Sequence, residues 1–142
     1  MNIATANWNN FDLKAYRFSW LGTSNLSVMV GLKAALDFHR ELGPEIVYAR
    51  IHELAAQVRE RLARYPQARI VNASADRFYG GMVTFEPADE KAKPLFERAA
   101  KECAARRIRV VGDATHFRVS THIFTQPAEL EAFFDVLHAA MA

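Results

Sequence analysis

The sequence predicts an α+β fold in which helices cover one face of a small, mostly antiparallel sheet. Apolar residues recur every three or four positions in four segments and alternate with polar residues in shorter segments. The shorter segments come in adjacent pairs, which favours antiparallel hairpins over a parallel sheet. The expected order of elements is an N-terminal arm followed by α, α, β, β, α, β, β and α.

The 142-residue chain has ordinary globular composition, with 51% hydrophobic and 24% charged residues, and its length fits one domain with at most an additional arm. The net charge of +2 gives no reason to expect nucleic acid or an anionic membrane as a partner. No signal peptide pattern is visible, and no apolar run reaches the roughly 20 residues that a bilayer requires. Because the single cysteine, Cys103, fits a reducing compartment, we expect a cytoplasmic protein.

The N-terminal half is predicted to hold an arm and two helices. Residues 1–17 show no periodicity and are expected to be an extended arm. Residues 26–41 should form a helix that is apolar on most faces at first, so we expect its first half to be buried. Gly43 and Pro44 separate it from a helix at about 45–65, because glycine often ends helices and proline begins them. The apolar residues of this second helix share one face: Val47, Ile51, Leu54, Ala55, Val58 and Leu62.

The rest of the chain alternates between strand and helix patterns. We expect strands at 69–72 and 80–85, a helix at 94–106, strands at 108–111 and 116–124, and a helix that begins at Pro127. Gly112 and Asp113 should form the turn between the last two strands. Cys103 falls on the apolar face of the third helix, so we interpret it as a buried, inert thiol.

The common catalytic and cofactor motifs are absent from the sequence. It contains no glycine-rich phosphate loop, dinucleotide fingerprint, His-Glu-x-x-His zinc motif or Gly-x-Ser-x-Gly elbow. No histidine lies at metal-ligand spacing from Cys103, so no metal site is expected.

The segment Phe-Ser-Trp-Leu-Gly-Thr-Ser-Asn at 18–25 is the first candidate site. Gly22 would let the backbone approach a ligand closely, and the hydroxyl of Thr23 next to a helix start could bind an anion. Taken alone, the segment favours a simple helix cap, because caps of this type are common.

The strand predicted at 116–124 is the second candidate site. Alternation places Phe117, Val119, Thr121 and Ile123 on one face and Arg118, Ser120 and His122 on the other. An arginine there could bind a carboxylate through two parallel hydrogen bonds. Alternatively, Arg118 pairs with a neighbouring glutamate on a solvated face, and the pattern favours neither reading.

Four segments, at 17–38, 43–62, 80–86 and 106–133, resemble the C-terminal part of class V aminotransferases, which are fold-type I pyridoxal-phosphate enzymes. The similarity is greatest to the isopenicillin N epimerase-like and cysteine desulfurase-like branch. The resemblance implies that residues 18–142 form the C-terminal small domain of such an enzyme, which acts on an amino acid. It also implies a homo-oligomer, because this domain contacts the cofactor of the neighbouring subunit.

The resemblance implies a role for each candidate site. Gly22 and Thr23 would contact the phosphate of pyridoxal 5'-phosphate across the dimer interface, and Arg118 would bind the substrate carboxylate. The family's strand usually continues with Tyr-Asn, whereas this chain has Phe124 and Thr125.

The large domain of these enzymes, which carries the Schiff-base lysine, has no counterpart in this sequence. None of the five lysines matches that position: Lys14, Lys33, Lys91, Lys93 and Lys101. We therefore expect no catalytic residue here and no activity from the isolated chain, which would need a large pyridoxal-phosphate-binding domain in cis or in trans. A fragment of a complete enzyme is the favoured interpretation, with a split-gene product or a free-standing domain as alternatives. The competing function is a non-catalytic module that binds a carboxylate ligand or another protein.

Overall fold

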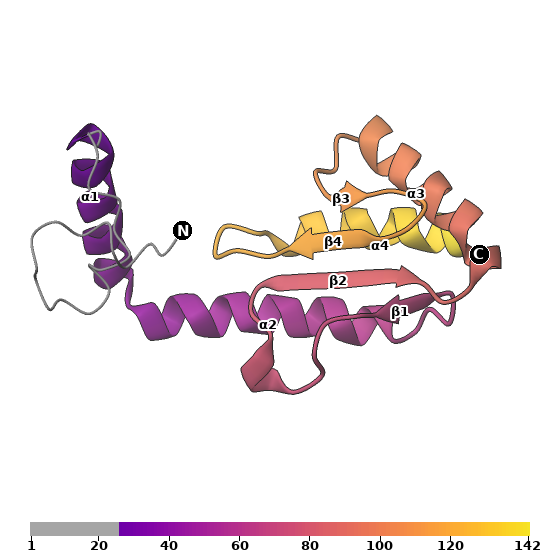
Figure 1. The fold of residues 1–142 in the computed structure, drawn as a ribbon, viewed down its shortest axis with the longest axis horizontal. Helices are drawn as coiled ribbons and strands as arrows, with labels where there is room; N and C mark the ends of the chain where they lie inside the picture. Colours follow the sequence, from indigo (N-terminus) through magenta and orange to yellow (C-terminus); the bar gives the residue numbers. More distant parts are fainter. Residues whose placement is uncertain (1–25) are drawn as a thin grey trace, which may run out of the picture. The chain divides into compact units, whose positions relative to one another are not determined.

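A computed structural model describes residues 26–142 (Figure 1). The arm expected at 1–17 and the candidate residues Gly22 and Thr23 lie outside the described residues. The elements are α1 (Leu26–Leu42), α2 (Pro44–Leu62), β1 (Ala68–Ile70), β2 (Met82–Pro87), α3 (Lys93–Ala105), β3 (Val111–Gly112), β4 (Phe117–Ser120) and α4 (Pro127–Met141), with short 3-10 turns at Asp76–Phe78 and Glu90–Ala92. This order confirms the predicted α+β arrangement. The chain divides into two compact units, Met1–Glu41 and Leu42–Ala142, and each is described by itself.

The exposure of helix α1 differs from the expectation. The sequence predicts a buried first half, yet Val28, Val30 and Leu32 are 65%, 62% and 54% exposed. Leu36 and Phe38 are also exposed.

Helix α2 begins as the sequence predicts and ends slightly earlier. Gly43 has a φ of 82°, which glycine adopts without strain, and Pro44 follows at the start of the helix. After Leu62 the backbone tightens into a turn, with the N–H of Tyr65 donating to the carbonyl of Leu62 at 3.0 Å. The buried face of α2 is the predicted one, apart from the half-buried Ile51: Val47, Leu54, Ala55, Val58 and Leu62.

The four strands form one antiparallel sheet in the order β1-β2-β4-β3. Both predicted hairpins are present, and β2 and β4 form the centre. Strand β4 ends at Ser120, four residues before the predicted end at Phe124. The N–H of Thr121 still donates to the carbonyl of Gly81, and the chain then turns at His122, whose carbonyl accepts the N–H of Thr125 at 2.9 Å. Strand β3 starts at Val111, so the expected strand at 108–111 is wrong for most of its length.

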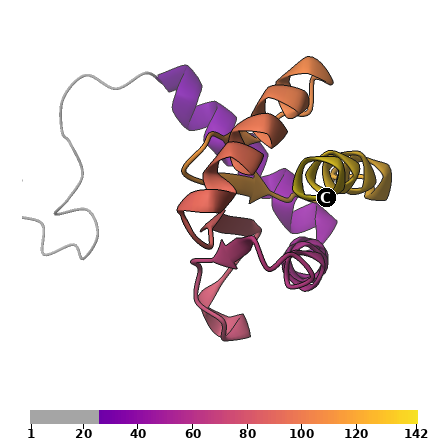
Figure 2. The ribbon, with the colours of Figure 1, turned by 90° about the vertical axis from the view of Figure 1, so that its right-hand side faces the viewer.

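Helices α2, α3 and α4 pack against one face of this sheet. Figures 1 and 2 show α2 and α4 side by side. A bidentate ion pair joins them, in which the two terminal nitrogens of Arg61 donate to the two carboxylate oxygens of Glu131 at 2.7 and 2.9 Å. The core contains aromatic rings from the sheet and from two helices: Phe85, Phe96, Phe117, Phe133 and Phe134. Cys103 is buried, and its burial raises the pKa of the thiol to about 11, in agreement with the prediction of an inert thiol.

Candidate functional site

The open face of the sheet carries Arg118. On β4, Phe117 and Val119 are buried while Arg118 and Ser120 are exposed, so the predicted alternation holds along the whole strand. Buried Thr121 continues the pattern, and its hydroxyl lies 3.0 Å from the carbonyl oxygen of Gly81 and 3.2 Å from that of Ile51. The core thus fixes which face of β4 points outward.

Arg118 has no acidic neighbour in its row of the sheet. It lies opposite Thr84 of β2 and Val111 of β3. Glu86, two residues along β2 from Thr84, forms an ion pair with Arg69 instead. Within residues 26–142, Arg118 forms no ion pair or side-chain hydrogen bond, so its guanidinium is available to an external anion.

The turn after β4 takes His122 out of the strand. The N–H of His122 donates to the Thr125 hydroxyl at 2.9 Å, and the His122 ring lies 4.4 Å from that of Phe124. This corrects the expectation that His122 continues the strand beside Arg118 and Ser120. It also gives Thr125, a departure from the family's usual sequence, a structural role in closing the turn.

The turn before β4 is held by the Asp113 carboxylate. Its Oδ1 accepts hydrogen bonds from the Thr115 hydroxyl at 2.6 Å, the Thr115 N–H at 2.7 Å and the His116 N–H at 3.1 Å. These bonds, the hydroxyl first, lower the pKa of Asp113 to about 2. A turn is therefore present at 113–116, with Asp113 as a structural acceptor, whereas Gly112, which was expected in the turn, belongs to β3 and pairs with Phe117.

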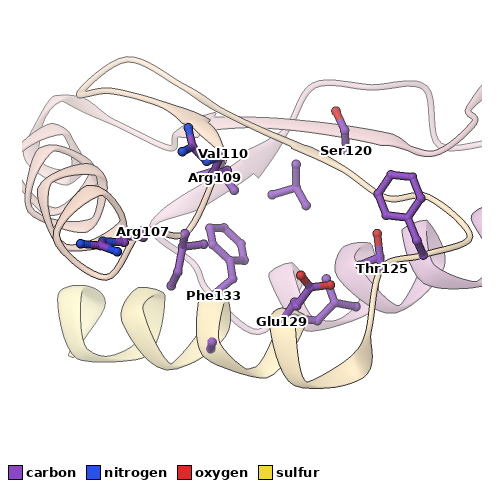
Figure 3. Close-up of a pocket in the computed structure, with 12 residues that line it drawn as sticks. Arg107, Arg109, Val110, Ser120, Thr125, Glu129 and Phe133 are labelled. Atoms are coloured by element: carbon purple, nitrogen blue, oxygen red, sulfur yellow. The ribbon is translucent and has the colours of Figure 1, made fainter.

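A cavity of about 450 Å³ lies between residues 107–110, the end of β4 and the start of α4 (Figure 3). It exists because β3 is too short to pair with Val119 and Ser120, which leaves a gap beside that part of β4. Figure 3 shows the Phe133 ring in the middle, with Glu129 and Thr125 toward one end and Arg107 toward the other. The sequence pattern does not indicate this cavity, because it predicts a strand over the whole of 108–111.

The four lysines among the described residues lie at the surface. Lys33, Lys93 and Lys101 form surface ion pairs within or next to helices, and Lys91 is an exposed residue of a 3-10 turn. In the same part of the chain, no three His, Cys, Asp or Glu side chains gather as a metal site. No helix from Leu26 onward has the length and hydrophobicity needed to cross a membrane.

Comparison with known proteins gives the affiliation of the chain. Isopenicillin N epimerase from Streptomyces clavuligerus is 28% identical over 123 residues, which are 83% of this chain and 30% of that protein. A probable cysteine desulfurase from Streptomyces coelicolor is 27% identical over 125 residues, and the alignment covers 82% of this chain and 30% of that protein. A probable hercynylcysteine sulfoxide lyase from Mycobacterium tuberculosis is 30% identical over 127 residues, and the alignment covers 85% of this chain and 32% of that protein. The chain thus spans about a third of the length of these relatives.

The family comparison covers most of the chain. The model of the aminotransferase class-V family matches residues 4–133, a range that includes both candidate sites. This match, together with the α+β architecture, agrees with the resemblance seen in the sequence. The chain belongs to the class V aminotransferase family.

Proposed function

We propose that residues 18–142 form the C-terminal small domain of a pyridoxal-phosphate-dependent enzyme, similar to isopenicillin N epimerase, that acts on an amino acid. In this proposal Arg118 binds the substrate carboxylate. The observation that carries it is the position of Arg118 on the open sheet face without an acidic partner among the described residues. The family affiliation supports an amino acid as the substrate class.

The chemistry that this chain performs is binding and orientation. Two parallel N–H···O bonds from a guanidinium fix the plane of a carboxylate as well as its position. The core anchors β4 through Phe117 and Val119, so the base of the Arg118 side chain is held by a rigid element. Pyridoxal phosphate supplies the electron sink when it is bound in the complete enzyme.

The cofactor and its covalent attachment belong to other parts of the assembly in this proposal. Gly22 and Thr23 would contact the cofactor phosphate of a neighbouring subunit, which requires a homo-oligomer. The attachment lysine would come from a large domain, in cis or in trans. The exposed apolar residues of α1 support such a partner, because surfaces of this kind usually mark interfaces.

The test uses the assembled enzyme, with this chain and the large domain together. Arg118→Ala should weaken amino-acid binding by about 2–5 kcal/mol if the assembly desolvates the ion pair, while cofactor content stays unchanged. Thr23→Ala should lower cofactor affinity. Arg64→Ala, which removes an exposed arginine from the turn after α2, is the matched control and should change neither quantity. Unchanged amino-acid affinity in the Arg118 variant would overturn the assignment.

A non-catalytic binding module is the second candidate function, and the cavity favours it. Its volume of about 450 Å³ suits a small molecule, and Arg107 and Arg109 line it together with apolar side chains such as Phe133. This function predicts carboxylate binding without pyridoxal phosphate and no effect of Thr23→Ala on any ligand. Titration of the chain with and without the cofactor separates the two functions.

A further inference from the structure

We propose that Arg109 is a second anion-binding residue beside Arg118, and that the site takes a substrate with two acidic groups. The inference rests on the proposed function, in which Arg118 holds the first carboxylate. Arg109 would then bind the second acidic group and so determine specificity.

The register of the sheet places the two arginines close together. Val111 lies opposite Arg118, and Arg109 precedes Val111 by two residues. Arg109 and Val111 are exposed while Val110 between them is half-buried, so the alternation of an extended chain continues through this segment. Arg109 therefore faces the same side of the sheet as Arg118. Two residues of chain span at most about 7 Å, so from the paired Val111 the Arg109 side chain starts within reach of a ligand that Arg118 also contacts.

Figure 3 shows where Arg109 and Ser120 lie at the cavity. Arg109 and Ser120 come from neighbouring segments, and both side chains point away from α4, the helix that carries Phe133. The Ser120 hydroxyl adds a hydrogen-bond donor on the same face as the two guanidinium groups.

The charge of this arginine pair is not neutralised within the described part of the chain. Neither Arg109 nor Arg118 forms an ion pair or a side-chain hydrogen bond there. The nearby carboxylates are already engaged, since Glu86 pairs with Arg69, Asp113 closes its turn, and Glu129 accepts the N–H of Gln126 at 2.7 Å. Two adjacent cations without an acidic partner create a positive potential that attracts a dianion more strongly than a monoanion.

The presence of two guanidinium groups on adjacent segments also determines how many acidic groups the ligand carries. Two guanidinium groups on adjacent segments can each take one carboxylate of a short dicarboxylic acid, or one carboxylate and another acidic group of an amino acid. A monocarboxylate would occupy only Arg118. The structure therefore assigns Arg118 to the group common to all substrates and Arg109 to the group that distinguishes them.

The test is an NMR titration of the full 142-residue chain with butanoate and glutarate, which differ by one carboxylate. Glutarate should bind about fivefold more tightly, as expected for one additional exposed ion pair. Arg109→Gln should remove this difference and leave butanoate affinity unchanged, whereas Arg118→Gln should weaken both ligands. Arg64→Gln, in the turn after α2, is the control and should alter neither affinity. The glutarate preference should also shrink as salt is added.

The outcomes separate the inference from the function on which it rests. If butanoate binding depends on Arg118 but glutarate shows no preference, the role of Arg109 is wrong and the carboxylate site stands. If neither ligand responds to Arg118→Gln, the carboxylate site itself is wrong, and the inference falls with it. Circular dichroism spectra of the variants verify that each exposed substitution leaves the fold intact.

Discussion

Gly112 of β3 illustrates how a single residue shapes the sheet that carries Arg118. A Cβ atom at this position would lie 2.3 Å from a ring carbon of Phe117, which is buried and stacked on Phe85. Gly112→Ala should therefore displace the ring and lower the free energy of unfolding by about 1–3 kcal/mol, measured by urea denaturation. Gly80→Ala is the control, because a Cβ atom added at Gly80 would meet nothing within 4 Å. Equal stability of the two variants would contradict this packing argument.

The β3–β4 turn is the element that brings Val111 opposite Arg118, and its acid sensitivity can be predicted. Because the pKa of folded Asp113 is lowered to about 2, the ionised carboxylate stabilises the turn. That contribution is complete above the unfolded pKa of about 3.9 and is lost as the pH falls through about 2. Thr115→Val removes the hydroxyl donor, so an NMR titration should show the pKa of Asp113 rising toward its ordinary value.

A matched substitution tests whether this effect is local to the turn. Thr125→Val also removes a turn hydroxyl, but that hydroxyl accepts the N–H of His122 and contacts no carboxylate in the described residues. It should leave the pKa of Asp113 unchanged. A pKa that stays near 2 in Thr115→Val would show that the backbone N–H groups alone hold the carboxylate.

The type and order of most elements follow from local patterns in the sequence, whereas the residues at which they end do not. The apolar stripe of α2 and the alternation of Phe117, Arg118 and Val119 are sufficient to predict which side chains are buried. The early end of β4 is not visible in the alternation, because the chain turns at His122, whose carbonyl accepts the N–H of Thr125 at 2.9 Å. The cavity depends on where β3 stops pairing with β4, and periodicity alone carries no signal for that point.

At the scale of the whole molecule, α1 carries several exposed apolar side chains. Leu36 and Phe38 are 51% and 59% exposed, while Lys33 and Asp37 form an ion pair on the same helix. The relatives are about three times as long as this chain, which agrees with a partner domain that would cover such residues. We therefore expect the isolated chain to self-associate, because exposed apolar patches of this kind recruit partners.

The double substitution Leu36→Glu and Phe38→Glu should reduce this association and also weaken binding to a large domain supplied in trans. Charged side chains at these positions would oppose the burial of apolar surface that drives both contacts. Sedimentation velocity over a range of protein concentrations measures the first effect, and co-purification with the large domain measures the second. Val71→Glu is the control, since Val71 is a comparably exposed residue of the other compact unit. If the double variant associates as strongly as the unmodified chain, the exposed side chains of Leu36 and Phe38 do not drive the association.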